Sequence, residues 1–147
     1  MTALRAPAAD DLAEIMLDLG RRARAAAHVL KQAPTGAKNK ALRAAAAAMR
    51  AETPAILAAN ARDIEAVTQK GATPAFVDRL AFDAKRIAGT AKGLDDVAAI
   101  PDPVGAVIAE WTRPNGLAIQ RVRVPLGVIG VIYESRPNVT ADAGGLC

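Results

Sequence analysis

The sequence predicts an α/β protein in which helices come first, a β-hairpin follows, and a strand, a turn and a helix stand last. Three observations predict this order. Apolar residues recur every three or four positions between Asp11 and Val97. Two β-prone segments then flank the pair Asn115-Gly116, and the continuous apolar run Gly127 to Tyr133 leads through a polar turn into a final helix. The first pattern is typical of amphipathic helices and the last of a strand buried on both faces.

The composition fits one soluble globular domain. Of 147 residues, 52% are hydrophobic and 23% are charged, which excludes a disordered chain. Much of the hydrophobic fraction is alanine, and aromatic residues reach only 3%, so each residue buries little area and we expect low stability. The net charge is +4, but the basic residues alternate with acids and no aromatic residues are interleaved with them. This pattern disfavours a nucleic-acid partner.

The helical part is expected to contain five helices, over residues 11–31, 37–52, 54–70, 74–80 and 83–97. Thr53 and Thr73 each precede a proline, and we expect both to act as caps with the proline at the first helical position. Asp83 is the expected start of the last of these helices. The residues expected to face inward are Leu12, Ile15, Met16, Leu19, Ala23, Ala26, Ala27, Leu30, Leu42, Ala45, Ala46, Met49, Ile56, Leu57, Ile64, Val67, Ile87, Leu94 and Val97.

The chain changes character after residue 103. Residues 106–111 and 117–124 are β-prone and are joined by a segment that ends in Asn115-Gly116, a pair that favours a tight hairpin turn. The run 127–133 is then expected to be the first strand of a parallel sheet. Gly127 and Gly130 do not make a dinucleotide-binding fingerprint, because no helix opens after them, and we attribute them to close backbone packing.

The turn Glu134-Ser135-Arg136-Pro137-Asn138 carries the candidate chemistry. Pro137 stiffens the turn and restricts Arg136. The Asn138 amide could donate to a developing oxyanion, and the Arg136 guanidinium could meet a phosphate or a carboxylate. A helix cap at Asn138 and a surface ion pair between Arg136 and Glu134 explain the same residues equally well, and the chemistry alone does not decide.

Several classes of site are disfavoured. His28 has no metal-ligand companion nearby, and no metal site is predicted. Cys147 has no neighbouring base to activate it and is expected to be a small buried hydrophobic residue. The N-terminal residues contain acids where a signal peptide has an apolar core, and no window approaches the roughly 20 apolar residues of a membrane span. We expect a cytoplasmic protein with no membrane partner.

The segment VPLGVIGVIYESRPNVTADA closely resembles the signature region of γ-glutamyl phosphate reductase, also called glutamate-5-semialdehyde dehydrogenase, of the aldehyde dehydrogenase superfamily. The upstream segments ILAANARDIEAV, DRLAFDAKRIAG and IPDPVGAVIAEWTRPNGLAIQRVRVPLG are similar to the same family. The resemblance implies an N-terminal segment of the family. Residues 1–103 would be the helical N-terminal part of the cofactor domain and residues 104–125 a hairpin resembling the oligomerisation element. Residues 126–147 would be the first strand, turn and helix of the NADP-binding core, which the chain does not complete.

What the resemblance implies about function is specific. Members reduce L-glutamate 5-phosphate to L-glutamate 5-semialdehyde with NADPH, the second step of proline biosynthesis, through a catalytic cysteine. Asn138 would be the oxyanion donor, and Tyr133, Glu134, Ser135 and Arg136 would line the nicotinamide end of the cofactor cleft. Homo-oligomers through the hairpin and association with glutamate 5-kinase are the implied assemblies. The family's catalytic cysteine lies in a later domain, so Cys147 is not that residue and the chain alone is expected to be inactive.

One departure and two alternatives accompany the resemblance. Gly144-Gly145 stands where the family usually has alanine or serine, and each glycine costs about 1 kcal/mol inside a helix. A different reading is a non-catalytic helical module for binding or assembly that pairs through its hairpin. A weaker one is a basic domain that binds anions.

Overall fold

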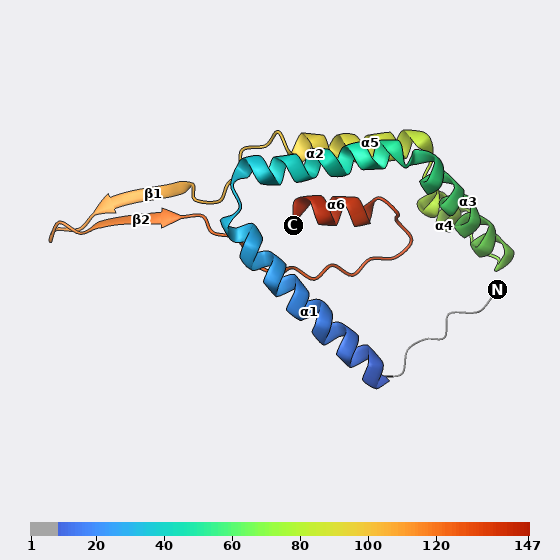
Figure 1. Cartoon of the computed structure of the whole chain (residues 1–147), viewed down its shortest axis with the longest axis horizontal. Coiled ribbons are helices and arrows are strands. Elements are labelled where there is room, and N and C mark those ends of the chain that lie inside the picture. Colours follow the sequence, from blue (N-terminus) through green and yellow to red (C-terminus); the bar gives the residue numbers. More distant parts are fainter. Residues whose placement is uncertain (1–8) are drawn as a thin grey trace.

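The computed structural model describes residues 9–147. Its elements in chain order are α1 (Ala9–Gln32), α2 (Thr35–Ala51), α3 (Thr53–Gln69), α4 (Pro74–Leu80), α5 (Ala84–Val97), β1 (Val107–Thr112), β2 (Ala118–Val122) and α6 (Val139–Leu146). Figure 1 shows α2 and α5 side by side with α6 beneath them, α3 and α4 at one end, and the hairpin as an arm at the other. The five predicted helices and the hairpin are all present, close to the expected positions.

Two of the three expected caps are confirmed. The Thr73 hydroxyl accepts a hydrogen bond from the Phe76 amide at 3.3 Å, and the Asp83 carboxylate accepts one from the Arg86 amide at 2.7 Å. The expectation for Thr53 is wrong. Glu52 holds the cap position of α3, and the Thr53 hydroxyl donates to the Met49 carbonyl at 3.1 Å instead. The backbone leaves α2 and enters α3 without the extended residue that a side-chain cap requires.

The core lies where α2, α5 and α6 meet. Ala46, Ala91 and Leu94 are buried there, and three partly buried residues pack on them: Leu42, Met49 and Ala141. Alanine at the helix contact permits close approach but buries little area, so this core is small. Ala45, which was expected to face inward, is exposed.

The apolar face of α1 departs from expectation. Leu12, Met16 and Leu30 are 50%, 59% and 51% exposed, although their spacing predicts a buried stripe. The reason is that no element within residues 9–147 packs extensively on α1. The pattern correctly identifies an apolar face on α1, but no element of the described chain packs extensively against that face.

The structure gives a steric reason for glycine at position 145, which the sequence alone does not reveal. A methyl group added at Gly145 would overlap the Leu94 side chain and would also lie 3.6 Å from Leu42 Cδ2. Nothing lies within 4 Å of the corresponding position at Gly144. The two adjacent glycines in α6 are therefore unlike, since only Gly145 allows the helix to approach α5.

We predict that Gly145→Ala and Gly144→Ala change stability in opposite directions. Gly145→Ala forces Leu94 to move within the core and should lower the free energy of unfolding by about 1–3 kcal/mol. Gly144→Ala should raise it by up to about 1 kcal/mol, because alanine is the better helix former. Urea denaturation followed by circular dichroism measures both. Equal effects of the two substitutions would contradict the steric assignment.

The hairpin is confirmed, with β1 and β2 antiparallel and Trp111 opposite Ile119. At the turn, Gly116 adopts φ 86°, a conformation that favours glycine, and the Asn115 side chain accepts from the Leu117 amide at 3.2 Å. A bulge interrupts the register between Val107 and Ala109.

Asp102 ties the base of the hairpin to the start of α2. Its carboxylate accepts hydrogen bonds from Lys38 Nζ at 2.7 Å, from Thr35 Oγ1 at 3.0 Å and from the Val104 amide at 3.0 Å. The hydrogen bond from Lys38, followed by that from the Val104 amide, lowers the pKa of Asp102 below its usual value. Asp102 therefore favours its ionised form in the folded chain.

We predict that this anchor weakens in acid. A carboxyl whose pKa is lower in the folded state adds stability above its unfolded pKa of about 3.9, and this stability is lost as the pH falls through the folded pKa. Asp102→Asn should lower the melting temperature near neutral pH, and the difference from the parent should shrink below about pH 4. Thermal unfolding over a pH series tests this. A difference that stays constant with pH would contradict the prediction.

The segment expected to form a strand, Gly127 to Tyr133, is not a strand in this structure. A strand requires a hydrogen-bonded neighbour, and within residues 9–147 the segment has none. Its side chains are exposed, with Ile132 fully exposed. Close packing does not explain its glycines, since nothing lies within 4 Å of a side-chain position at Gly127 or Gly130. Gly127 instead adopts φ 95°, which favours glycine.

We predict that the purified chain self-associates through this segment, because an extended apolar stretch with unpaired backbone groups recruits another strand. Light scattering should show species larger than a monomer at micromolar concentration. Ile132→Lys should shift the distribution towards monomer, whereas Val29→Lys on α1 should shift it less. A monodisperse parent chain would contradict the prediction.

Candidate functional site

Two shallow grooves adjoin the turn before α6, and both are lined by Arg86 and Asn138. The first groove has a volume of about 410 Å3 and lies between α5 and α6, where Thr90 and Asp142 add to its walls. The second has a volume of about 240 Å3 and lies between the α4–α5 loop and the turn, where Arg79 and Arg136 add to its walls. Asn138 therefore stands at the junction of the two grooves.

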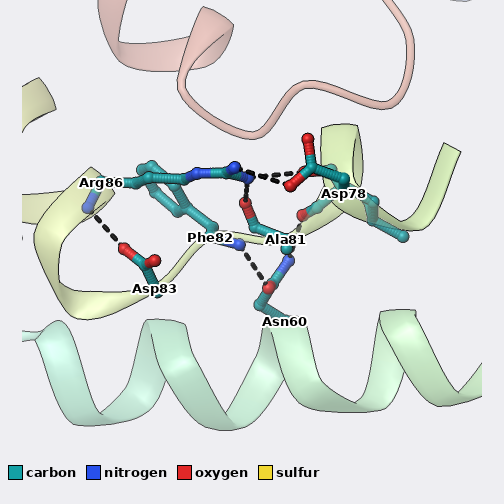
Figure 2. Close-up of polar contacts among 7 residues, drawn as sticks. Asn60, Asp78, Ala81, Phe82, Asp83 and Arg86 are labelled. Carbon is teal, nitrogen blue, oxygen red and sulfur yellow. Dashed lines mark hydrogen bonds and ion pairs between the residues drawn. The ribbon is translucent and has the colours of Figure 1, made fainter. Parts of the chain in front are cut away.

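The α4–α5 loop is fixed by one buried amide. Asn60 on α3 is 8% exposed; its Nδ2 donates to the Leu80 carbonyl at 2.8 Å and its Oδ1 accepts from the Phe82 amide at 2.7 Å (Figure 2). Both polar ends of the side chain are satisfied by loop backbone that lies about twenty residues away in sequence. Because a buried amide with unmatched partners is costly, this pair of bonds holds the loop in one conformation.

Arg86 reinforces the same loop from α5. Its Nη1 donates to the carbonyls of Asp78 and Ala81 at 2.5 and 2.6 Å, and its Nη2 meets Asp78 Oδ1 at 2.8 Å. Figure 2 shows this guanidinium spanning the loop above Asn60. These hydrogen bonds engage Nη1 and Nη2 with the loop. Arg86 therefore helps to hold the walls of the grooves in place.

Asn138 begins α6 but does not cap it. Its backbone is helical, with φ −63° and ψ −28°, and its side chain makes no cap hydrogen bond. The amide Nδ2 instead donates to Asp142 Oδ2 at 2.7 Å, which leaves its second N–H for a ligand. The Asp142 carboxylate opposes negative charge at this position, whereas Arg86 in the same grooves favours it.

The four residues expected to bind the cofactor are distributed around the turn. Tyr133 Oη lies 2.7 Å from Thr140 Oγ1 on α6, and Ser135 is half-buried. The Glu134 carbonyl accepts from the Arg136 amide, but within residues 9–147 the two side chains form no ion pair. Arg136 lines the second groove with Asn138, whereas Tyr133 and Glu134 line neither groove.

Sequence reasoning missed Asn60, Arg79 and Arg86. Asn60 lies among the alanines of a helical pattern, and nothing local distinguishes it from a surface residue. The signal in the sequence is the charged segment DRLAFDAKR, in which Asp78 and Arg86 flank a short loop. Asp78 lies in α4 and Arg86 in α5, so the spacing rules that hold within one helix did not predict their pairing.

Other candidates carry no chemistry here. Cys147 is exposed, so the expectation that it is buried is wrong; α6 presents that end to solvent. His28 is exposed on α1. Among residues 9–147 there is no group of three metal-ligating side chains. No helix in this part of the chain is both long and apolar enough to span a membrane.

Comparison with known proteins finds similar sequences and structures of one kind of enzyme. No protein-family model matches the chain. The gamma-glutamyl phosphate reductase of Rhodospirillum rubrum is 62% identical over 138 residues, which is 94% of this chain and 32% of that protein. The gamma-glutamyl phosphate reductase of Paramagnetospirillum magneticum is 61% identical over 137 residues, 93% of this chain and 32% of that protein.

Two crystal structures share the fold. The gamma-glutamyl phosphate reductase of Thermotoga maritima superposes with a TM-score of 0.85 at 45% identity, over 88% of this chain and 31% of that one. The Saccharomyces cerevisiae enzyme of the same name gives a TM-score of 0.84 at 31% identity, over 88% and 33%. The predicted α/β fold class is confirmed by this match. The chain spans about a third of the length of its curated relatives, and over the matched residues it is similar to gamma-glutamyl phosphate reductases.

Proposed function

We propose that the chain supplies one wall of the active site of a γ-glutamyl phosphate reductase. The observation that carries the proposal is the junction of the two grooves at Asn138, in a chain 62% identical to a reductase of that name. The complete reaction converts L-glutamate 5-phosphate, NADPH and a proton into L-glutamate 5-semialdehyde, NADP+ and phosphate. This is a step of proline biosynthesis, and its substrates suit a cytoplasmic enzyme.

The residues of the turn fit a nicotinamide cofactor. Tyr133, Glu134, Ser135 and Arg136 would contact the cofactor through backbone groups and hydroxyls, which are the donors and acceptors that a ribose and an amide require. When bound, NADPH supplies the hydride. The turn would hold the cofactor near Asn138, and the second N–H of the Asn138 amide would stabilise the negative charge on the substrate oxygen.

We propose that Cys147 is not the nucleophile of this reaction, because it is exposed and has no base within reach in sequence. The resemblance to the family implies that the catalytic cysteine lies in a later domain. We therefore propose that the chain alone does not turn over. The exposed hairpin is the proposed contact for homo-oligomers, and the proposed partner enzyme is glutamate 5-kinase.

A chimera tests the proposed function. In it, this chain replaces the matching segment of the Rhodospirillum rubrum reductase. We expect the chimera to restore growth without proline to a bacterium that lacks its own reductase, and we expect the 147-residue chain alone to fail. A soluble, folded chimera that does not restore growth would contradict the proposal.

A further inference from the structure

Two arginines in the second groove have no partner for their guanidinium groups. Within residues 9–147, neither Arg79 nor Arg136 makes a side-chain hydrogen bond or an ion pair, although both line the groove of about 240 Å3. Arg86, the third arginine there, is held by Asp78 and by loop carbonyls. The groove therefore presents two cations from different elements, one at the end of α4 and one in the turn before α6.

A carboxylate stands in the same wall. Asp78 uses Oδ1 to accept from Arg86, and its side chain is 74% exposed. Among the described residues Oδ2 accepts no hydrogen bond, so it is available to a cationic ligand group. The groove thus offers separate places for a negative and a positive group.

We propose that this groove binds the amino-acid end of the substrate, with the α-carboxylate on Arg79 and Arg136 and the α-ammonium on Asp78. The inference rests on the proposed function for the identity of the substrate. Arginine suits a carboxylate because its planar fork can donate two parallel hydrogen bonds. A phosphate dianion fits less well, because the Asp78 carboxylate repels it.

The groove is prearranged for this task. Asn60 and Arg86 fix the loop that follows Asp78 and Arg79, and Pro137 restricts the backbone of Arg136. A binding site whose walls are already ordered loses less conformational entropy when the ligand arrives. Binding of a small zwitterion to this chain therefore requires no rearrangement of the loop.

Titration of the 147-residue protein, followed by nuclear magnetic resonance of the arginine side chains, tests the proposal. The titration uses the Ile132→Lys background, which is expected to favour the monomer, and light scattering verifies the monomer before the titration. The probes are L-glutamate, glutarate (which lacks the ammonium) and inorganic phosphate, at equal ionic strength. We expect saturable shifts at Arg79 and Arg136 with L-glutamate, weaker binding of glutarate, and no saturable binding of phosphate at the same concentrations.

Three variants sharpen the test. Arg136→Gln should weaken L-glutamate binding about tenfold, as expected for a lost charge-assisted hydrogen bond. Asp78→Asn, which retains an acceptor for Arg86, should weaken L-glutamate but not glutarate. Arg121→Gln on the exposed hairpin is the matched control and should change neither. The proposal fails if L-glutamate gives no saturable shift, if phosphate binds as tightly as L-glutamate, or if Arg121→Gln matches Arg136→Gln.

This titration is independent of catalysis. An active chimera together with absent L-glutamate binding would overturn the groove assignment and leave the reductase function standing. An inactive chimera together with the expected titration would overturn the function and leave an amino-acid-binding groove.

Discussion

Ile87→Ala is expected to lower the free energy of unfolding by about 2–4 kcal/mol. Ile87 is 0% exposed and is the largest fully buried side chain among the described residues. The cost combines the lost transfer of apolar atoms from water with the cavity that remains. Besides Ile87, the buried apolar residues of the described chain are three alanines (Ala46, Ala91 and Ala98) together with Phe82 and Leu94, so few large side chains are available to fill a cavity.

Ile87→Val is the matched control, since it removes one methylene and should cost only about 0.5–1.5 kcal/mol. Urea denaturation followed by circular dichroism measures both variants. Typical domains are stable by only 5–15 kcal/mol, and a small alanine core suggests the lower end, so Ile87→Ala should approach global unfolding. If the alanine variant were no less stable than the valine variant, the assignment of Ile87 to the buried core would be wrong.

Asn138→Ala in the chimera is expected to reduce kcat by about 10²–10³-fold with little change in KM for the substrate. The reason is that an oxyanion donor acts mainly on the transition state, where the negative charge on oxygen is largest. The measurement is steady-state kinetics of NADPH oxidation with the acyl phosphate, or of the reverse reaction with semialdehyde, phosphate and NADP+.

A structural role of Asn138 makes a different prediction, because its amide also donates to Asp142. Asp142→Ala removes that hydrogen bond while leaving Asn138 in place, and it should change kcat far less than Asn138→Ala. Asn115→Ala in the hairpin turn is the control for the loss of an asparagine elsewhere. Equal losses for Asn138→Ala and Asp142→Ala would show that the pair stabilises α6 and that Asn138 is no oxyanion donor.

Local chemistry was sufficient to predict much of the fold. The caps at Thr73 and Asp83 and the turn at Asn115-Gly116 each depend on atoms only a few residues apart, and the structure has all three. Thr53 shows where such reasoning fails. The same threonine-proline pair stands at a junction that continues from one helix almost directly into the next, and the hydroxyl then bonds backwards to Met49.

What depends on distant parts of the chain could not be predicted. Periodicity indicates that Leu12 and Met16 on α1 require cover, but it does not say which element covers them. The apolar run that ends at Tyr133 has the composition of a buried strand, yet strands form only beside a partner. The Asn60 side chain forms hydrogen bonds with backbone groups of a loop some twenty residues away, and only the folded chain brings Asn60 and this loop together.

The candidate site also has a part that the sequence indicates and a part that only the folded chain shows. The turn from Glu134 to Asn138 stood out in the sequence, but a helix cap and a surface ion pair explained its residues as well as a ligand site did, and only the resemblance to the family gave them a role. The sequence does not show that Arg79 and Arg136 line one groove, because the first lies on α4 and the second in the turn before α6.

Phosphate-dependent reduction of NADP+ by L-glutamate 5-semialdehyde, measured in parallel for the 147-residue chain and for the chimera, tests the central claim most directly. If the chain supplies one wall of a reductase active site, the chimera turns over at a rate comparable to that of the parent enzyme, and the chain alone shows no turnover. Turnover by the chain alone, or a folded chimera without activity, would contradict the claim.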